Sequence, residues 1–296
     1  MEFETKVQFL TQPEHNRRTI VISDIHGHRA WLEKLLKKVN FSEKDILIIV
    51  GDMIEKGPES LNTIRYIMEL CEKYTVYPMM GNVDLWRIQM LLTEDGSLDQ
   101  ELYETNERMR QSWKATFFQD LCLEAGVSAK TPEEISAARE AVVAHFQREL
   151  TFMKELPSIL VAPAFTFVHG GLVHEKLEDN FHLPPFRLLK NDNFINQGKY
   201  FDKYVVVGHW PVCLYRSDIE SSAPYISEEQ KIIAIDGGCG IKRDDQLNAL
   251  IIPDLYSEET IWESVDDFPE AVVLEDQEAG TSSINIRYYE SELKVL

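Results

Sequence analysis

The sequence predicts an α/β fold with a mainly parallel sheet, and three observations support this. Short apolar runs rich in β-branched residues alternate with stretches of helical periodicity. The order strand, helix, strand, helix requires crossover connections, which join parallel strands. Polar residues beside glycine follow almost every apolar run, as at the carboxyl edge of an open α/β sheet. The chain has 296 residues, which is enough to bury a large core.

The apolar runs are short and are expected to be buried strands. They are Thr19–Ser23, Asp45–Val50, Thr75–Met80, Ala164–Val168, Tyr204–Val207 and Lys231–Ile235. Helices are expected at His28–Val39 and Ser60–Lys73, where leucine and isoleucine recur on one face. After Pro253 the chain is acidic and less regular, and Ser282–Tyr289 alternates as a closing strand would.

The middle of the chain lacks a strand pattern from residue 85 to residue 156. This predicts a helical insertion (85–156) within a single domain (1–296), closing over one side of it. Leu98–Glu124 is expected to form one long amphipathic helix. Thr131, Pro132 and Glu134 supply an N-cap, a proline at the first helical position and an acid three residues after the cap. The helix that follows is expected to run to about Leu156.

The composition excludes several classes of protein. Acidic residues number 50 and basic residues 30, which gives a net charge of −20 and argues against nucleic-acid binding and against docking on anionic lipid. No apolar run approaches the ~20 residues of a membrane span, and the N-terminus lacks the apolar core of a signal peptide. The 4 cysteines show no metal-site spacing, so we expect reduced thiols in a cytoplasmic protein.

Side chains that bind metals follow the predicted strands, beside glycine in most cases. The motifs are Asp24-Ile25-His26-Gly27, Gly51-Asp52, Gly81-Asn82, His169-Gly170-Gly171, Gly208-His209 and Asp236-Gly237-Gly238. Asp24 and Asp52 are 28 residues apart, and Asp52 and Asn82 are 30 apart, each about one strand–helix–strand unit. Each motif alone is usually a turn or a solvated loop. The ordered set at one sheet edge indicates a metal site.

These motifs resemble the calcineurin-like metallophosphoesterase superfamily. The resemblance covers about residues 19–252 and implies a four-layer α/β/β/α sandwich of two mixed sheets with a dinuclear metal centre. Pro211 stands where nuclease-like and diesterase-like branches have a second histidine. His169-Gly170-Gly171, Asp236-Gly237-Gly238 and Leu247-Asn248-Ala249-Leu250 look like the branch of Ser/Thr protein phosphatases and symmetrical dinucleoside tetraphosphatases.

The resemblance also implies roles for the motif residues. Asp24 and His26 would bind one metal ion, and Asp52 would bridge both. The ligands of the other ion would be Asn82, His169 and His209. Carboxylate oxygens with imidazoles suit two divalent ions, with Mn²⁺ expected and Fe or Zn²⁺ as alternatives. Such a pair can lower the pKa of water and aim it at phosphorus. Asp236 is expected to orient His209 or to cap a turn.

The sequence departs from the family pattern at three places. Val83 replaces the histidine that usually protonates the leaving alkoxide, a step typically worth 10²–10⁴-fold. Lys56, preceded by Glu55, replaces an arginine that grips phosphate, and so loses its bidentate fork. Asn191 takes the place of a second arginine, for which Lys190 or Arg187 are the candidate replacements.

Several polar residues are candidates for the open roles. Asp84, His28 or His174 could supply the missing proton, although each is more often a neighbouring or surface group. Trp210 could stack on a substrate ring at the cleft rim, or be buried against the insertion. Cys239 is expected to be a buried, inert thiol. The candidate catalytic residues are thus Asp52, Asp84 and Lys56; the candidate substrate-binding residues are Lys56, Arg187, Lys190, Asn191, Trp210 and His28.

The function expected from these residues is metal-dependent hydrolysis of a phosphomonoester, similar to that of a protein phosphatase and favouring aryl or tyrosyl leaving groups. The substrate would be a phosphorylated protein or a small phosphoester. One alternative is hydrolysis of a dinucleoside polyphosphate or of a phosphodiester, because a phosphate leaving group also tolerates Val83. A second alternative is an inactive, metal-bound binding module. The acidic surface favours a substrate with one phosphate on a less negative carrier.

Overall fold

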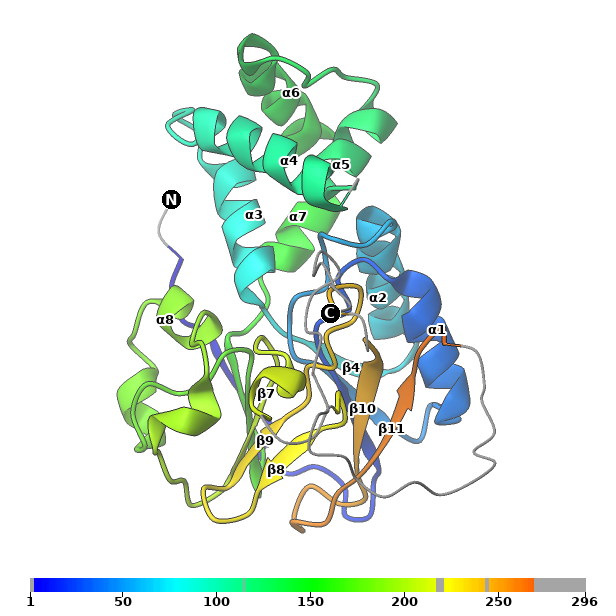
Figure 1. Cartoon of the computed structure of the whole chain (residues 1–296), viewed down its shortest axis with the longest axis vertical. Coiled ribbons are helices and arrows are strands. Elements are labelled where there is room, and N and C mark those ends of the chain that lie inside the picture. The colour runs from blue at the N-terminus through cyan, green and yellow to red at the C-terminus, as the bar shows by residue number, and fades with distance from the viewer. Residues whose placement is uncertain (1–2, 114, 217–220, 243–244, 269–296) are drawn as a thin grey trace, which may run out of the picture.

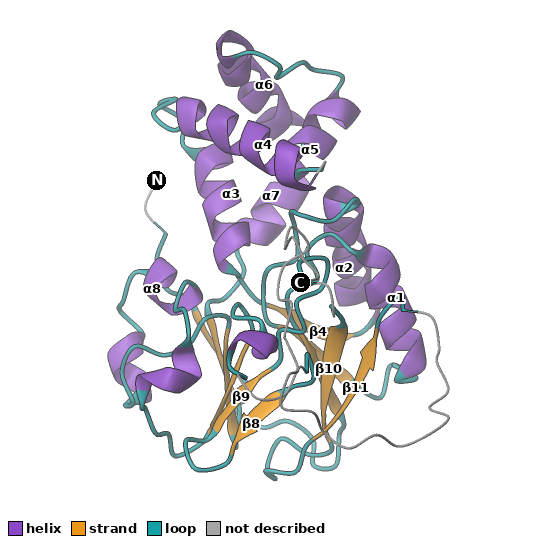
Figure 2. Ribbon diagram, viewed as in Figure 1, coloured by secondary structure: helices purple, strands orange, loops and turns teal. Residues whose placement is uncertain are grey.

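The centre of the molecule consists of two mixed β-sheets (Figures 1 and 2). The computed structural model describes residues 3–113, 115–216, 221–242 and 245–268. The five-stranded sheet contains, in spatial order, β11 (Ile261–Val265), β10 (Leu247–Ile252), β2 (Thr19–Ile22), β3 (Ile46–Ile49) and β4 (Thr75–Pro78). The six-stranded sheet contains β1 (Val7–Phe9), β5 (Ile159–Val161), β6 (Phe165–Val168), β7 (Tyr204–Val207), β9 (Ile232–Ala234) and β8 (Tyr225–Ser227).

Parallel pairing brings the carboxyl ends of the motif-bearing strands to one edge. In the five-stranded sheet β2, β3 and β4 are parallel, with Ile22 opposite Ile49 and Ile49 opposite Pro78. In the six-stranded sheet β6, β7 and β9 are parallel. β10 runs antiparallel to β2, and β5 antiparallel to β6, which makes both sheets mixed. The first three motifs therefore follow one sheet and the last three follow the other.

The two sheets pack face to face through apolar side chains that alternate along their strands. Val21 and Ile48 of the five-stranded sheet pack with Phe167 and Val206 of the six-stranded sheet in one apolar core. Burial of each such side chain stabilises the fold by about 1.5–3 kcal/mol. Because successive residues of a strand face opposite sides, Ile22 belongs to a different core, the one under the helices.

Helices cover the outer face of each sheet. α1 (Arg29–Lys38) and α2 (Ser60–Lys73) cover the five-stranded sheet, with Leu32 and Ile64 packed in the core that contains Ile22. On the six-stranded sheet, Val205 packs with Leu188 of α8 (Pro185–Leu189) in a third core. The short helices η1 (Leu177–Asn180), η2 (Phe194–Gln197) and η3 (Val212–Leu214) complete this side. The result is the expected α/β/β/α arrangement of two mixed sheets between helices.

Residues between β4 and β5 form only helices in the part of the chain described. They are α3 (Asn82–Leu92), α4 (Asp99–Trp113), α5 (Phe117–Ala125), α6 (Pro132–His145) and α7 (Gln147–Lys154). Figure 1 shows α4 and α6 as a lobe at the top of the molecule, whereas the two sheets lie in its lower half. Two other helices of this segment, α5 and α7, pack on the core, since both contact α2.

The long helix predicted at Leu98–Glu124 is wrong. α4 ends at Trp113, and a new helix, α5, begins at Phe117. Thr116 caps α5, since its Oγ1 accepts a hydrogen bond from the backbone N–H of Gln119 at 3.0 Å. A second break separates α6 from α7 at Phe146, whose ring is completely buried and whose backbone is not helical. The helix predicted to run to Leu156 therefore consists of two.

The strand predicted at Ser282–Tyr289 lies outside the described residues. Among the described helices, none has the length and the apolar character that crossing a membrane requires.

Candidate metal centre

The predicted ligands lie at the ends of strands from both sheets. Asp24 follows β2, Asp52 follows β3, His169 follows β6 and His209 follows β7. Backbone hydrogen bonds join neighbouring loops: the N–H of Asp24 donates to the carbonyl of Gly51 at 3.1 Å, and the N–H of Gly208 to the carbonyl of His169 at 2.9 Å. Asn82 is the first residue of α3, just after β4.

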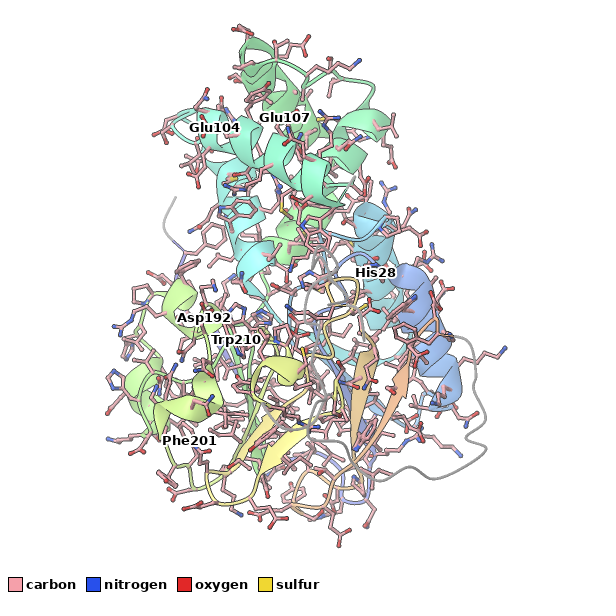
Figure 3. All side chains as sticks on the ribbon, in the orientation of Figure 1. His28, Glu104, Glu107, Asp192, Phe201 and Trp210 are labelled. Atoms are coloured by element: carbon pink, nitrogen blue, oxygen red, sulfur yellow. The ribbon has the colours of Figure 1, made fainter. Side chains whose placement is uncertain are left out.

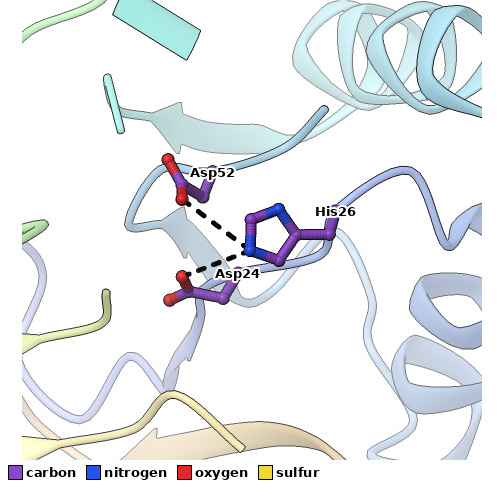
Figure 4. A group of neighbouring side chains, drawn as sticks. All are labelled: Asp24, His26 and Asp52. Carbon is purple, nitrogen blue, oxygen red and sulfur yellow. Dashed lines mark ion pairs between the residues drawn. The ribbon is translucent and has the colours of Figure 1, made fainter. Parts of the chain in front are cut away.

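One group of possible ligands consists of Asp24, His26 and Asp52 (Figure 4). The Nε2 atom of His26 lies 3.8 Å from Oδ1 of Asp24 and 3.7 Å from Oδ2 of Asp52. Nδ1 of His26 lies 3.1 Å from the carbonyl oxygen of Ile54. This carbonyl favours the tautomer with the proton on Nδ1, so that Nε2 faces the two carboxylates as a third electron-pair donor. Three such donors around one point suit a cation.

A second group of predicted ligands shares Asp52. Nε2 of His169 lies 3.3 Å from Oδ1 of Asp52 and 3.1 Å from Oδ1 of Asn82. Nδ1 of His169 lies 2.7 Å from the carbonyl oxygen of Val50, so that Nε2 is the ring nitrogen that faces Asp52 and Asn82. The ring centroid of His209 is 5.3 Å from that of His169. Asp52 thus lies between the two groups, as a bridging ligand must.

Buried negative charge also fits divalent ions. Burial and the nearby charge of Asp236 raise the pKa of Asp24 well above its usual range. Burial lowers the pKa of His169, but the carboxylates of Asp52 and Asp24 outweigh this and raise it to about 10. Asp236 is completely buried, and its Oδ2 has no hydrogen-bond partner among the described residues. This donor set, with carboxylates, an amide oxygen and imidazoles, fits two divalent cations.

Backbone strain is concentrated at these ligands. Asp24, His26, Asp52 and His209 have φ values of 53°, 46°, 50° and 65°, in the left-handed region. Each such residue costs about 1–3 kcal/mol and persists only where the surroundings hold it. Strained backbone at several ligands of one site is typical of a functional centre rather than of a solvated turn.

Asp192 is a site residue that the sequence-based predictions do not include, although it directly follows Asn191. Its Oδ1 lies 2.6 Å from Nε2 of His209, and Nζ of Lys190 lies 3.4 Å from the same nitrogen. The carboxylate favours a proton on Nε2 of His209 and leaves Nδ1 as an electron-pair donor. The sequence signal that could have found it is its position directly after Asn191, which takes the place of the family's second arginine.

Two of the predicted phosphate-binding residues reach the centre. Nζ of Lys56 lies 2.9 Å from Nε2 of His26. Lys190 forms an ion pair with Asp192 next to His209. Arg187 is exposed on α8, and its charge acts on Lys199. Asn191 accepts a hydrogen bond from Nε2 of Gln197 at 2.7 Å, and its own Nδ2 is buried without a partner among the described residues.

The candidates for a replacement proton donor are held in other roles. Both carboxylate oxygens of Asp84 accept backbone N–H groups, from Met53 at 3.1 Å and from Gly81 at 2.9 Å, and its side chain is completely buried. Burial and the charge of Asp52 raise the pKa of Asp84 to about 7. Asp84 thus joins the loops that carry Asp52 and Asn82, and its catalytic role stays a prediction.

The two histidines differ in position. His28 precedes α1, with Nδ1 3.2 Å from the carbonyl oxygen of Ile25, and its ring is packed closely enough that a Cβ on Gly240 would lie 2.1 Å from it. His174 is exposed in the loop after β6 and is held there by a backbone hydrogen bond to Asn180.

Trp210 and Cys239 are also placed. Trp210 follows His209 and is half-buried, and Figure 3 shows it near Asp192, across from His28. The indole Nε1 is buried without a partner among the described residues. Cys239 is buried, and burial raises the pKa of its thiol well above the usual value, as expected for an inert cysteine.

Comparison with known proteins gives a consistent result. The family model described as calcineurin-like phosphoesterase matches residues 17–219. Symmetrical bis(5'-nucleosyl)-tetraphosphatases are similar: that of Vibrio parahaemolyticus is 41% identical over 68 residues (23% of this chain, 25% of the relative). That of Coxiella burnetii is 34% identical over 92 residues (31% of this chain, 30% of the relative). The matched region therefore spans less than a third of these relatives.

A solved structure extends the similarity in fold. The "Crystal structure of a putative diadenosine tetraphosphatase" aligns with a TM-score of 0.54 at 20% identity, and covers 88% of this chain and 98% of that chain. At this identity the alignment shows a shared fold.

Proposed function

Since the chain belongs to the calcineurin-like phosphoesterase family, and is therefore a metal-dependent phosphoester hydrolase, we propose that it cleaves a phosphoanhydride bond in a dinucleoside polyphosphate of the diadenosine tetraphosphate type. The sequence favoured a phosphomonoester and held this substrate as an alternative. The relatives named as symmetrical tetraphosphatases support the alternative more strongly.

The observation that carries the proposal is the environment of the leaving group. The side chain of Val83 offers no proton, and its backbone N–H donates to Oδ1 of Asp52, the carboxylate that would bridge the two ions, at 2.9 Å. Asp84 is occupied by backbone groups, as described above. A phosphate leaving group needs little protonation, whereas an alkoxide depends strongly on a general acid. A site with valine at this position therefore suits an anhydride.

The residues present would divide the work as follows. Asp24, His26 and Asp52 would hold one divalent ion, and Asp52, Asn82, His169 and His209 the other; we propose Mn²⁺ for both. When bound, the ions would polarise the phosphoryl oxygens and lower the pKa of the attacking water. Lys56 would place a positive charge on the phosphoryl group. Lys190 lies beside His209, where it forms an ion pair with Asp192.

Hydrolysis of an aryl phosphomonoester is a second candidate, because the same observation favours it. A phenolate also leaves without a strong acid. A phosphotyrosine-like group would then replace the polyphosphate.

A substrate panel separates these functions. The protein with Mn²⁺ would be assayed on diadenosine tetraphosphate, an aryl phosphate, an aryl phosphodiester and a phosphoserine peptide, beside Asp52→Asn. The proposal predicts the highest kcat/KM on the tetraphosphate, lost in the variant. Turnover of the aryl phosphate with none of the tetraphosphate would establish the second candidate. No metal-dependent turnover on any of these substrates would contradict both.

A further inference from the structure

A buried ion pair joins the helical insertion to the loop that carries Asp52 and Lys56. Nε of Arg87, on α3, lies 2.6 Å from Oε1 of Glu55, and both side chains are 0% exposed. Nη1 and Nη2 of Arg87 have no hydrogen-bond partner among the described residues. Glu55 is therefore the carboxylate that Arg87 depends on, and a charge pair so fully removed from water is expensive to break.

The rest of Glu55 is also fixed by hydrogen bonds. Its Oε2 accepts the backbone N–H of Phe117 at 3.2 Å, at the first residue of α5, where a helix attracts negative charge. Its own backbone N–H donates to Oγ of Ser60 at 2.9 Å, at the start of α2. One residue of the loop after β3 is thus held by α2, α3 and α5 together, and the last two belong to the insertion.

The residue that follows is Lys56, one of the predicted phosphate-binding residues. Glu55 and Lys56 are consecutive left-handed residues, with φ values of 67° and 68°. A hydrogen bond of 2.8 Å from the N–H of Gly57 to the carbonyl of Glu55 closes the turn. Non-glycine residues keep such backbone angles only when neighbouring contacts hold them. The direction of the Lys56 side chain toward His26 therefore depends on the anchoring of Glu55.

We propose that the Glu55–Arg87 ion pair is a positioning device through which the helical insertion holds Lys56 against the phosphoryl group. The inference rests on the proposed function for the identity of the group that Lys56 binds. Neither Glu55 nor Arg87 touches substrate; both act through Lys56. The insertion then has a role in phosphate binding at the metal centre, in addition to covering one end of the molecule.

The test uses isosteric variants and a matched control. Asp99 and Arg139 form another ion pair of the insertion, also with 2.6 Å between Nε and the carboxylate, and with 17% and 5% of their side chains exposed. Glu55→Gln and Asp99→Asn each remove one carboxylate charge from such a pair. Isothermal titration calorimetry would measure binding of inorganic phosphate to each Mn²⁺-loaded protein and, separately, binding of Mn²⁺ to each metal-free protein.

Glu55→Gln should weaken phosphate binding at least about fivefold, since charge-assisted contacts are geometry-dependent, with Mn²⁺ binding unchanged. Asp99→Asn should change neither. In a Lys56→Ala background, Glu55→Gln should have no further effect, as for two residues that act through one contact. Equal phosphate affinity of Glu55→Gln and wild type, or a parallel loss of Mn²⁺ binding, would overturn the proposal. So would a full Glu55→Gln effect in the Lys56→Ala background.

If Glu55→Gln fails to fold, the double variant Glu55→Leu/Arg87→Met takes its place, because apolar residues often replace a buried ion pair without loss of stability. It should bind Mn²⁺ normally and phosphate weakly, and normal phosphate binding would contradict the proposal. These binding measurements need no turnover. A failure to hydrolyse diadenosine tetraphosphate would therefore contradict the proposed function, whereas the positioning role of the ion pair could still be tested by these binding measurements.

Discussion

The carboxylate of Asp192 lies 2.6 Å from Nε2 of His209, while the backbone N–H of His209 donates to Oδ2 of Asp24 at 2.9 Å. One histidine therefore connects a ligand of the first metal group with a carboxylate from the segment after α8. Burial and the positive charge of His169 lower the pKa of His209 to about 4, so that its ring is neutral near pH 7. A neutral ring with an oriented N–H is what a metal-binding histidine requires.

Asp192→Asn should weaken binding of the second Mn²⁺ about 10–100-fold, because a neutral amide no longer orients the His209 ring through a charged hydrogen bond. Calorimetric titration of the metal-free protein with Mn²⁺ would show this as a loss in one class of site. Asp179→Asn is a suitable control, since Asp179 is an exposed residue of η1. Identical titrations of the two variants would rule out an orienting role for Asp192.

Gly208→Ala should abolish binding at the first metal group. A Cβ at Gly208 would lie 2.2 Å from Oδ2 of Asp24, so that the carboxylate would have to move. Gly126, by contrast, has no atom within 4 Å of such a Cβ, although its φ of 69° makes alanine strained there. Gly126→Ala should lower the thermal midpoint and keep both Mn²⁺ sites. Retention of two sites in Gly208→Ala would show that Asp24 is not a ligand.

Val83→His should restore a proton donor beside Asp52. We expect kcat/KM for an alkyl phosphomonoester to rise at least about tenfold, the low end of what general acid catalysis contributes. Diadenosine tetraphosphate and an aryl phosphate should respond much less. Val83→Leu, which adds bulk without a proton, is the control. An equal increase on all three substrates would mean that position 83 does not act on the leaving group.

Asp120→Asn tests a burial penalty within the insertion, because Asp120 lies on α5. Burial, with a smaller effect of the Glu55 charge, raises the pKa of Asp120 from 3.8 to about 6. Since the folded-state pKa is the higher one, the stability that protonation adds is complete below pH 3.8 and is lost as pH rises through 6. After discounting for the solvent exposure of Asp120, we expect the free energy of unfolding of the variant to be about 1 kcal/mol higher than that of the wild type at pH 7.5.

This advantage of Asp120→Asn should disappear near pH 4. Urea unfolding at both pH values measures it. The same difference in free energy at both would show that the carboxylate carries no burial penalty in the folded protein.

The sequence predicted the strands that matter most for the site, because each is an apolar run that ends in a motif; β4, expected to be buried, is half-buried. It did not predict β1, β5 and β8, which have 3 residues each and are too short for a pattern. It also did not predict β10, because Leu247–Leu250 was interpreted only as a family motif. β11 is mostly exposed and carries no apolar signal. The break before Phe117 was missed because the amphipathic pattern continues through it, and only the cap at Thr116 marks the new helix.

The positions of the candidate metal ligands could be predicted because each directly follows a predicted strand or its closing turn. Parallel strands bring Asp24 and Asp52 to one edge of the five-stranded sheet, and His169 reaches them because the six-stranded sheet packs against it with its own motif-bearing loops at the same end. Asp192, Glu55 and Arg87 could not be assigned in this way. Their roles depend on contacts between segments far apart in the chain, such as the ion pair that Arg87 makes with a residue 32 positions away.

The most direct measurement is the rate of diadenosine tetraphosphate hydrolysis as a function of Mn²⁺ bound per chain, for the wild type and for Asp52→Asn. Asp52 lies between both groups of ligands, so a dinuclear centre should reach full activity only at two ions per chain. The variant should lose at least about a thousandfold in kcat. Activity that persists in Asp52→Asn, or that is unaffected when a chelator removes the metal, would contradict a dinuclear centre at this edge of the sheets.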